Sequence, residues 1–141
     1  MATVDTPGGS IRVVNVHLGT RVNSRNRLTQ LSSALDEVNG FDGPQLIGGD
    51  FDTMNILWFR TMWPFPYLQR QSRAVGEAPA SRGFRTPLTA TSSTFSFLGP
   101  PFKLDWLYVR NLQAFAWSVD RIRFPDHHAA WVQLDLRSIR S

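Results

Sequence analysis

Apolar and polar positions along the chain follow two different periods, and each period predicts a different kind of element. In six short segments the apolar residues alternate with polar ones or run together, which is the pattern of strands. These segments cover residues 11–17, 45–49, 94–97, 104–110, 113–119 and 130–136. From residue 27 to 38 the apolar positions recur at helical spacing, which predicts an amphipathic helix capped by Ser24 or Asn26 and ended by Gly40.

The remaining segments carry weaker signals. Residues 1–10 are expected to form a loose lead-in, and residues 53–62 a short second helix that ends before Pro64. Residues 63–92 are rich in Pro, Ser, Thr, Arg and Gly, so we expect a long loop there. Residues 111–112 are expected to form the tight turn of a hairpin between the two strands that flank them.

The order strand, helix, strand, helix, loop and then several strands predicts a mixed α/β (α+β) fold in a single domain over residues 1–141. The chain is 42% apolar and 18% charged, which suffices for a packed core. No segment approaches the ~20 consecutive apolar residues of a membrane span, and the first residues lack the apolar centre of a signal peptide. The absence of Cys excludes disulfides, thiolate catalysis and cysteine-rich zinc sites, and we expect a cytoplasmic protein.

Among the charged residues, Arg greatly outnumbers Lys and Asp greatly outnumbers Glu. Fourteen of the fifteen basic residues are Arg, whose planar guanidinium suits the recognition of phosphate. A bias in genome composition would give the same result, and the Arg residues are scattered, so they predict no nucleic-acid-binding stripe. Nine of the eleven acidic residues are Asp, and several stand beside Gly or His, where surface solubility explains them poorly. The Asp residues are therefore the better guide to a functional site.

Two carboxylates follow the strand at 45–49, in the sequence Gly-Gly-Asp-Phe-Asp-Thr that begins at Gly48. The two glycines allow a close approach of the backbone. If residues 50–52 stay extended, Asp50 and Asp52 point to the same face. Alternatively, the segment is a turn in which Asp52 caps the helix that follows. The sequence leaves both interpretations open.

Further polar groups lie at other strand ends. Asp105 interrupts an otherwise apolar strand, where a buried carboxylate is costly unless it meets a cation. Asp126 and His127 come just before the last strand, and His17 ends the first one. Open α/β sheets build their sites at such ends. Several Asp with one or two His and no Cys form the ligand set of a hard cation, so we expect Mg²⁺ (or Mn²⁺), which can polarise a phosphoryl oxygen.

Five short motifs succeed one another along the chain. They are Val14-Asn15-Val16-His17-Leu18, Arg27-Leu28-Thr29-Gln30-Leu31, Gly49-Asp50-Phe51-Asp52-Thr53, Leu104-Asp105-Trp106-Leu107-Tyr108-Val109 and Asp126-His127. In this order they resemble the endonuclease/exonuclease/phosphatase superfamily, and the resemblance covers nearly the whole chain from residue 11 onward. It implies a DNase I-like β-sandwich flanked by helices. It also implies a metal-dependent phosphoesterase or phosphodiesterase, whose substrate would be a phosphate ester such as a nucleic acid or a phospholipid headgroup.

The resemblance implies a role for each matching residue. Asp50 would orient or deprotonate the attacking water on the metal side of the site, and Asp126 would be a second metal-side carboxylate. His127 would bind the phosphate and stabilise charge in the transition state, with Asp105 supporting its ring. His17 would assist the leaving group.

Two departures from the superfamily's pattern change these expectations. Asp52 stands where the superfamily has an Asn that contacts the phosphate. Its charge would weaken substrate binding unless a metal ion lies between them or Asp52 is protonated. The superfamily's metal-binding Glu comes from the preceding half of the domain, and neither Glu37 nor Glu77 matches its position. We therefore expect the chain to correspond to the carboxy-terminal part of the domain, without that ligand; His128 receives no role.

If the amino-terminal half of the domain is missing, the chain would build mainly one sheet, and the inner face of that sheet would be left bare. Burial of apolar surface is worth ~25 cal/mol per Å². We therefore expect the chain either to self-associate through that face as a homodimer or to be a truncated product. In a homodimer, the strand at residues 130–136 would be the segment that the subunits exchange. Two functions remain open: a metal-dependent phosphodiesterase, and a non-catalytic remnant of the fold that keeps a weak metal or phosphate site.

Overall fold

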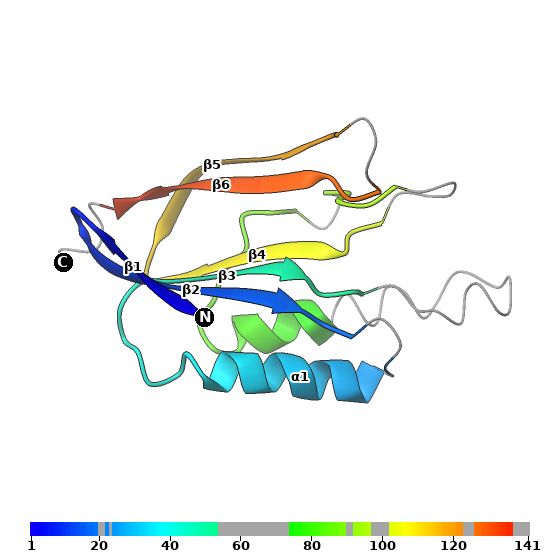
Figure 1. Ribbon diagram of the computed structural model, residues 1–141, viewed down its shortest axis with the longest axis horizontal. Helices are drawn as coiled ribbons and strands as arrows, with labels where there is room; N and C mark the ends of the chain where they lie inside the picture. Colours follow the sequence, from blue (N-terminus) through cyan, green and yellow to red (C-terminus); the bar gives the residue numbers. More distant parts are fainter. Residues whose placement is uncertain are drawn as a thin grey trace, which may run out of the picture.

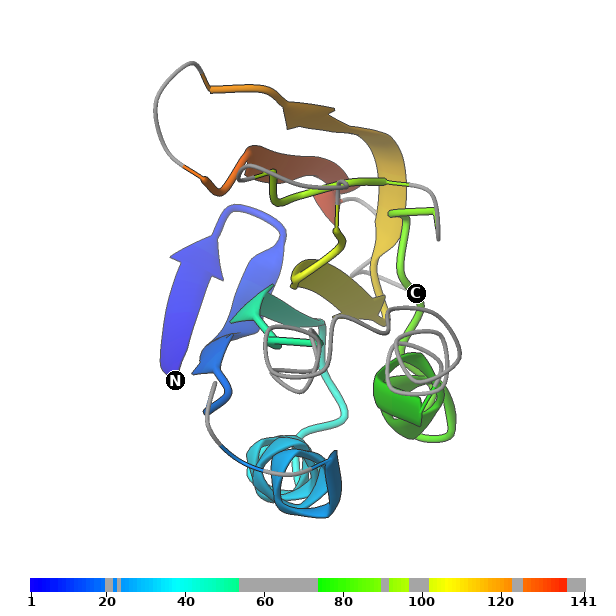
Figure 2. The same cartoon turned by 90° about the vertical axis from the view of Figure 1, so that its right-hand side faces the viewer.

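The protein is represented by a computed structural model, which describes residues 1–19, 22, 24–53, 74–89, 92–96, 102–122 and 126–136. These residues form a four-stranded sheet, a two-stranded sheet and helices, arranged in three layers (Figure 1). The helices cover one face of the four-stranded sheet, and the two-stranded sheet lies over the other face (Figure 2). This is the mixed α/β architecture that the order of elements predicts.

The larger sheet has the strand order β1-β2-β3-β4. β1 (Ala2–Thr6) and β2 (Gly9–His17) are antiparallel neighbours, and β3 (Gln45–Asp50) runs parallel to β2. A parallel pair needs a crossover connection, which α1 (Ser24–Asp36) supplies here. β4 (Asp105–Arg110) then pairs with β3 in the antiparallel direction.

The smaller sheet consists of β5 (Gln113–Asp120) and β6 (Ala129–Asp135), which are antiparallel. The predicted hairpin across residues 111–112 is wrong, because β4 and β5 belong to different sheets. Asn111 takes a left-handed φ of 54°, and the chain leaves the larger sheet at this turn. The expectation of mainly one sheet is also wrong, since the final strand pairs with β5 of the same chain.

Two further expectations need correction. Residues 1–10 are not a loose lead-in, because β1 forms a ladder with β2 around a turn in which the Thr6 hydroxyl donates to the carbonyl of Gly9. Residues 63–92 are not one long loop, because residues 74–80 are helical. Val75 anchors that helix in the core at 2% exposure, and packing of this kind overrides a sequence that contains Gly and Pro.

Other predicted boundaries shift or lie outside the described part. Residues 94–97 were expected to be a strand, but among residues 94–96, which the structure describes, only Phe95 forms bridges, one to Phe102 and one to His127. The helix expected at 53–62 falls almost entirely on residues 54–73, which lie outside the described ranges. The amphipathic helix predicted over residues 27–38 spans Ser24–Asp36, so both Ser24 and Asn26, its predicted caps, lie within the helix, and a turn follows Asp36.

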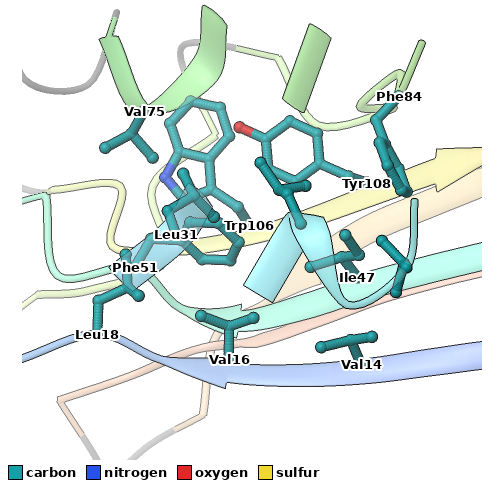
Figure 3. Packing of buried hydrophobic residues seen from close by; sticks show 12 residues of the cluster. Val14, Val16, Leu18, Leu31, Ile47, Phe51, Val75, Phe84, Trp106 and Tyr108 are labelled. Atoms are coloured by element: carbon teal, nitrogen blue, oxygen red, sulfur yellow. The ribbon is translucent and has the colours of Figure 1, made fainter. Parts of the chain in front are cut away.

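The main hydrophobic core lies between the helices and the four-stranded sheet (Figure 3). Alternate residues of the central strands point into it, and the apolar stripe of α1 packs on them. The buried cluster comprises Val14, Val16, Leu18, Leu31, Leu35, Val38, Ile47, Phe51, Val75, Phe84, Trp106 and Tyr108. The rings of Trp106 and Tyr108 stack with their planes 4° apart, and both lie against the helix at 74–80 in Figure 3.

The opposite face of the larger sheet is covered less completely. Ile11 and Val109 are buried there, whereas Leu46 and Leu107 on the same face are only half-buried. On the smaller sheet, Phe115 keeps 62% of its surface exposed. In the part of the chain that the structure describes, no helix is long and apolar enough to span a bilayer.

A pair of phenylalanines tests whether the segment after the helix at 74–80 belongs to the core. Phe84 is 3% exposed and Phe115 is 62% exposed. We expect Phe84→Ala to lower the free energy of unfolding by about 3–5 kcal/mol. The matched change Phe115→Ala should stay within about 0.5 kcal/mol of the wild type. Urea unfolding followed by circular dichroism measures both, and equal small losses would contradict the assignment of Phe84 to the core.

Candidate active site

Three polar residues stand side by side at one end of the four-stranded sheet. In the register of the strands His17 of β2 is paired with Asp50 of β3, and Asp50 is paired with Asp105 of β4. Paired residues of neighbouring strands point to the same face. That face is opposite to the core, because Val16 and Trp106, which precede His17 and follow Asp105, point into the core. The sheet therefore presents a row of one imidazole and two carboxylates on its open side.

The backbone at residues 49–52 gives Asp50 its place in this row. Gly49 has a φ of 138°, and a Cβ atom there would lie 2.0 Å from the carbonyl oxygen of Val16. Only glycine fits this approach of β3 to β2. Beyond the strand, the Asp50 carboxylate accepts a hydrogen bond from the backbone N–H of Asp52 at 2.8 Å. One carboxylate oxygen of Asp50 thus holds the turn, and the other, Oδ2, faces the open side.

His127 completes the cluster from the smaller sheet. Its Nδ1 lies 2.9 Å from Oδ2 of Asp105, and its Nε2 lies 3.9 Å from Oδ2 of Asp50. The ring of Phe95 meets the imidazole edge to face, with centroids 5.1 Å apart and planes at 77°. The imidazole is therefore fixed between two carboxylates and one aromatic ring, although its residue stands just before β6 rather than on the larger sheet.

The surroundings of His127 favour its protonated form. Burial alone would lower the pKa of His127, but the hydrogen bond and the charge of Asp105 outweigh that effect. The charges of Asp50 and Asp126 act in the same direction, so the pKa is raised from its usual 6.5. The surroundings therefore favour the imidazolium, which is the form that can meet a negatively charged ligand.

Asp52 lies next to this cluster but turns toward α1. Its φ is 40°, so residues 50–52 are not extended, and the interpretation that Asp50 and Asp52 share a face through an extended strand is wrong. The carboxylate of Asp52 is buried, with Oδ2 3.6 Å from the guanidinium of Arg27. Burial raises the pKa of Asp52, and Asp50 adds to the rise, while Arg27, His17 and His127 oppose it.

Arg27 is a neighbour of the cluster to which the sequence analysis gave no role, although it begins one of the five motifs. Its side chain is 3% exposed, and its guanidinium donates to the carbonyl oxygens of Gly19 and Val22 at 3.2 and 3.4 Å. A basic residue within the first turn of an amphipathic helix usually faces solvent, so the spacing of apolar residues along the helix did not indicate that Arg27 is buried. The guanidinium supplies the cation that the buried Asp52 requires.

Asp126 occupies a different position from the other acids. It is exposed, and its Oδ1 accepts a hydrogen bond from the backbone N–H of His127 at 3.0 Å. Within the described ranges, no group of three or more His, Asp or Glu side chains is arranged to hold a metal ion. The structure thus brings His17, Asp50, Asp105 and His127 together, and it leaves the predicted metal ligation by Asp126 and Asp50 as a prediction.

His128 has a structural environment of its own. It is 8% exposed, its Nε2 lies 2.9 Å from the hydroxyl of Ser96, and its backbone N–H donates to the carbonyl of Thr94. These contacts attach the segment before β6 to residues 94–96. The sequence predicted a strand over residues 94–97 but gave Thr94 and Ser96 no role, because small hydroxyl residues in a stretch of Ser and Thr carry no signal of a site.

Two solved structures share this arrangement of elements. The crystal structure of a functionally unknown conserved protein from Enterococcus faecalis V583 superposes with a TM-score of 0.61 at 19% identity, over 89% of this chain and 50% of that one. The endonuclease domain of TRAS1, a telomere-specific non-LTR retrotransposon, superposes with a TM-score of 0.55 at 14% identity, over 89% of this chain and 58% of that domain. The fold is DNase I-like.

The similarity concerns the fold and about half the length of each of these two structures. No protein-family model matches the sequence, and no curated protein matches it. The expected DNase I-like sandwich is confirmed, with its two sheets and flanking helices. The roles of the site residues stay predictions, and the contacts in this chain say which variants test them.

The pair of His127 and Asp105 yields a first prediction for the site. We expect Asp105→Asn to lower the pKa of His127, because the variant loses the negative charge that favours the imidazolium. In the wild type the raised pKa stabilises the fold, fully so below pH ~6.5, and this contribution is lost as the pH rises through the raised value. An NMR titration of the His127 ring measures the shift. An unchanged His127 pKa in folded Asp105→Asn protein would contradict the assigned contact.

Asp52 gives a second pH-dependent prediction, in the same direction as the contribution of His127 in the wild type. Because burial raises its pKa from 3.8, the folded state binds the proton more tightly than the unfolded state does. Stability associated with this group is therefore lost as the pH rises from below 3.8 through the raised value. Relative to the wild type, Asp52→Asn should become more stable with rising pH over that interval, as measured by urea unfolding. The exposed Asp42→Asn is the matched control, and a pH-independent difference for Asp52→Asn would refute the expectation.

Proposed function

We propose that this chain is a phosphodiesterase of the endonuclease/exonuclease/phosphatase superfamily, in which Asp50 and His127 assist the attack of water on phosphorus together with Mg²⁺ (or Mn²⁺). One observation carries the proposal. The imidazole of His127 is held between two carboxylates, at 2.9 Å from Asp105 and 3.9 Å from Asp50, at the open end of the larger sheet. The DNase I-like fold supports it, since an endonuclease domain has the same fold.

His127 suits the binding of a phosphate and the stabilisation of its transition state. The hydrogen bond to Asp105 engages Nδ1, which fixes the ring and leaves Nε2 directed toward Asp50. The raised pKa of His127 favours the imidazolium, in which Nε2–H can donate to an oxygen of the phosphate. A fixed donor of this kind stabilises the charge that develops on the oxygens during the displacement.

Asp50 suits the activation of water. Its Oδ1 is engaged by the backbone N–H of Asp52, so the side chain is held in one orientation. Its Oδ2 remains on the side of His127 and can accept the proton of a water molecule that attacks phosphorus. His17, its neighbour in the register, is exposed and stands on the same face, where it can assist the departing oxygen.

The site offers few protein ligands for the expected metal ion. Mg²⁺ in phosphate-processing enzymes is commonly held by one or two carboxylates, with water and substrate oxygens as its other ligands. Asp50 and Asp126 would be those carboxylates here. When bound, the ion would polarise a phosphoryl oxygen. The described residues contain no group of three or more acidic or His side chains arranged to hold a metal ion, so a bound ion would take its remaining ligands from water and substrate.

Asp52 is better explained as a support for the turn than as a contact to the phosphate. The position corresponds to the superfamily's phosphate-binding Asn, and the sequence left open whether a metal ion or a proton neutralises the Asp. The structure places the guanidinium of Arg27 beside it instead, with both side chains buried. Arg27 therefore reduces the repulsion that Asp52 exerts on a bound phosphate.

A nucleic acid is the substrate that we propose, and a phospholipid headgroup is the alternative. The proposal draws on the similarity of the fold to an endonuclease domain. The cytoplasmic location and the homodimer stay predictions.

A second candidate function is a non-catalytic remnant that retains the fold with a weak phosphate or metal site. The positions of the two Glu residues favour it. Glu37 follows the end of α1 and is close in sequence to the start of β3, so it lies at the end of the sheet opposite to Asp50. Glu77 is exposed on the helix at 74–80. Neither carboxylate can replace the superfamily's metal-binding Glu in this chain.

Hydrolysis of bis-p-nitrophenyl phosphate with Mg²⁺ or Mn²⁺ distinguishes the two functions. We expect metal-dependent turnover that falls by about 10²–10⁴-fold in Asp50→Asn and in His127→Ala. Asp50→Asn keeps an oxygen that can accept the N–H of Asp52, so the turn should remain intact. A nucleic-acid substrate would also be nicked in a supercoiled-plasmid assay with the same loss in both variants.

The matched control for the kinetic test is Asp42→Asn, an exposed carboxylate near the start of β3, which should retain full activity. No turnover by folded wild-type protein, together with a His127 resonance that still shifts on addition of phosphate, would establish the remnant. Turnover that persists in both site variants would refute the proposed roles of Asp50 and His127.

A further inference from the structure

The two members of the His127–Asp105 pair belong to different sheets. Asp105 begins β4 of the four-stranded sheet, and His127 stands just before β6 of the two-stranded sheet. Hydrogen bonds within each sheet cannot fix the distance between them. A separation of 2.9 Å between Nδ1 and Oδ2 therefore needs a connection between the sheets close to the site.

Residues 94–96 form such a connection. On one side, the backbone of Thr94 and of Phe95 bonds to the carbonyl of Phe102, just before β4. On the other side, the N–H of His128 donates to the carbonyl of Thr94 at 2.7 Å, and the N–H of Ser96 donates to the carbonyl of Asp126 at 2.8 Å. The segment therefore joins the residues before β4 to the residues before β6.

Thr94 has the central position in this segment. It is completely buried, and its hydroxyl oxygen accepts two hydrogen bonds, from the N–H of Leu104 at 3.0 Å and from the N–H of Asp105 at 2.8 Å. Successive N–H groups of a regular strand point in opposite directions. Their convergence on one oxygen bends the backbone at the first residue of β4, where the Asp105 side chain departs.

We propose that Thr94 positions Asp105 and His127 against each other, by binding the backbone of Asp105 through its hydroxyl and the backbone next to His127 through its carbonyl. Thr94 touches neither substrate nor reacting atoms in this proposal, so it is a positioning residue. The inference deepens the proposed function and rests on it for the kinetic effect. The geometric part concerns the pair alone.

The experiment compares Thr94→Val with Thr94→Ser. Valine keeps the shape of the side chain but removes the acceptor of two buried N–H groups, whereas serine keeps the hydroxyl. The first readout is the downfield proton resonance of the His127 Nδ1–H at a fixed pH, identified by its loss in Asp105→Ala. We expect this resonance to disappear or move upfield in Thr94→Val and to return in Thr94→Ser.

The second readout is the hydrolysis of bis-p-nitrophenyl phosphate with Mn²⁺. A displacement of about 1 Å at a reacting centre lowers turnover by about 10²-fold. We expect a loss of that size in kcat for Thr94→Val with KM nearly unchanged, and recovery in Thr94→Ser. Ser96→Ala is the control on the same segment, because among the described residues its hydroxyl meets the ring of His128, and it should leave the His127 resonance in place.

The outcomes separate this inference from the proposed function. An unchanged His127 resonance in folded Thr94→Val would overturn the positioning role, whatever the activity. If the wild type shows no turnover, the proposed function fails while the resonance still decides the role of Thr94. If Thr94→Val does not fold, Thr94→Cys replaces it, because a thiol is a weak acceptor and should give a smaller shift in the same direction. An unshifted resonance in Thr94→Cys would likewise overturn the proposal.

Discussion

The hydrogen bond between His127 and Asp105 crosses from one sheet to the other, and the geometry of the site depends on it. A carboxylate at the start of a strand is costly to bury partly unless a donor meets it. The imidazole meets Asp105 through Nδ1 and at the same time brings Nε2 toward Asp50. The raised pKa of His127 follows from this arrangement, because the negative charges around the ring outweigh its loss of hydration.

The same requirement for charge compensation recurs on the other side of Asp50. Asp52 is buried in a left-handed turn, and Arg27 reaches it from the first turns of α1. Paired buried charges of this kind tolerate the loss of one partner poorly. The turn after β3 therefore holds two carboxylates in different environments. One is open toward His127, and the other is enclosed against the helix. Different environments give two similar groups different chemical roles.

The layering of the fold separates stability from function. The core between the helices and the larger sheet is closely filled, whereas the face toward β5 and β6 is only partly covered. The polar row at the end of that face is consequently accessible on one side while its backbone is anchored by the core on the other. Sites built on strand ends gain precision from such a scaffold. The connection at residues 94–96 extends that precision to the smaller sheet.

The sequence predicted much of the fold because local patterns determine local elements. Alternation gave the central strands to within a residue or two, and helical spacing gave the helix that begins at Ser24. It failed at residues 1–10 and 74–80, where pairing with β2 and contact with the core decide the structure of weakly patterned segments. It also failed at the turn after β4, since no local pattern says which sheet the next strand will join.

For the site, the sequence by itself determined the types of groups available and their placement at strand ends. It named Asp105 because an acid that interrupts an apolar strand is costly without a purpose, and it named Asp50 and His127 for their places at strand ends. Only the tertiary structure decided which groups touch, that Asp52 pairs with Arg27, and that Thr94 links the two sheets. The physical reason is that contacts between residues distant in sequence depend on the packing of whole elements, and a short stretch of sequence contains no record of that packing.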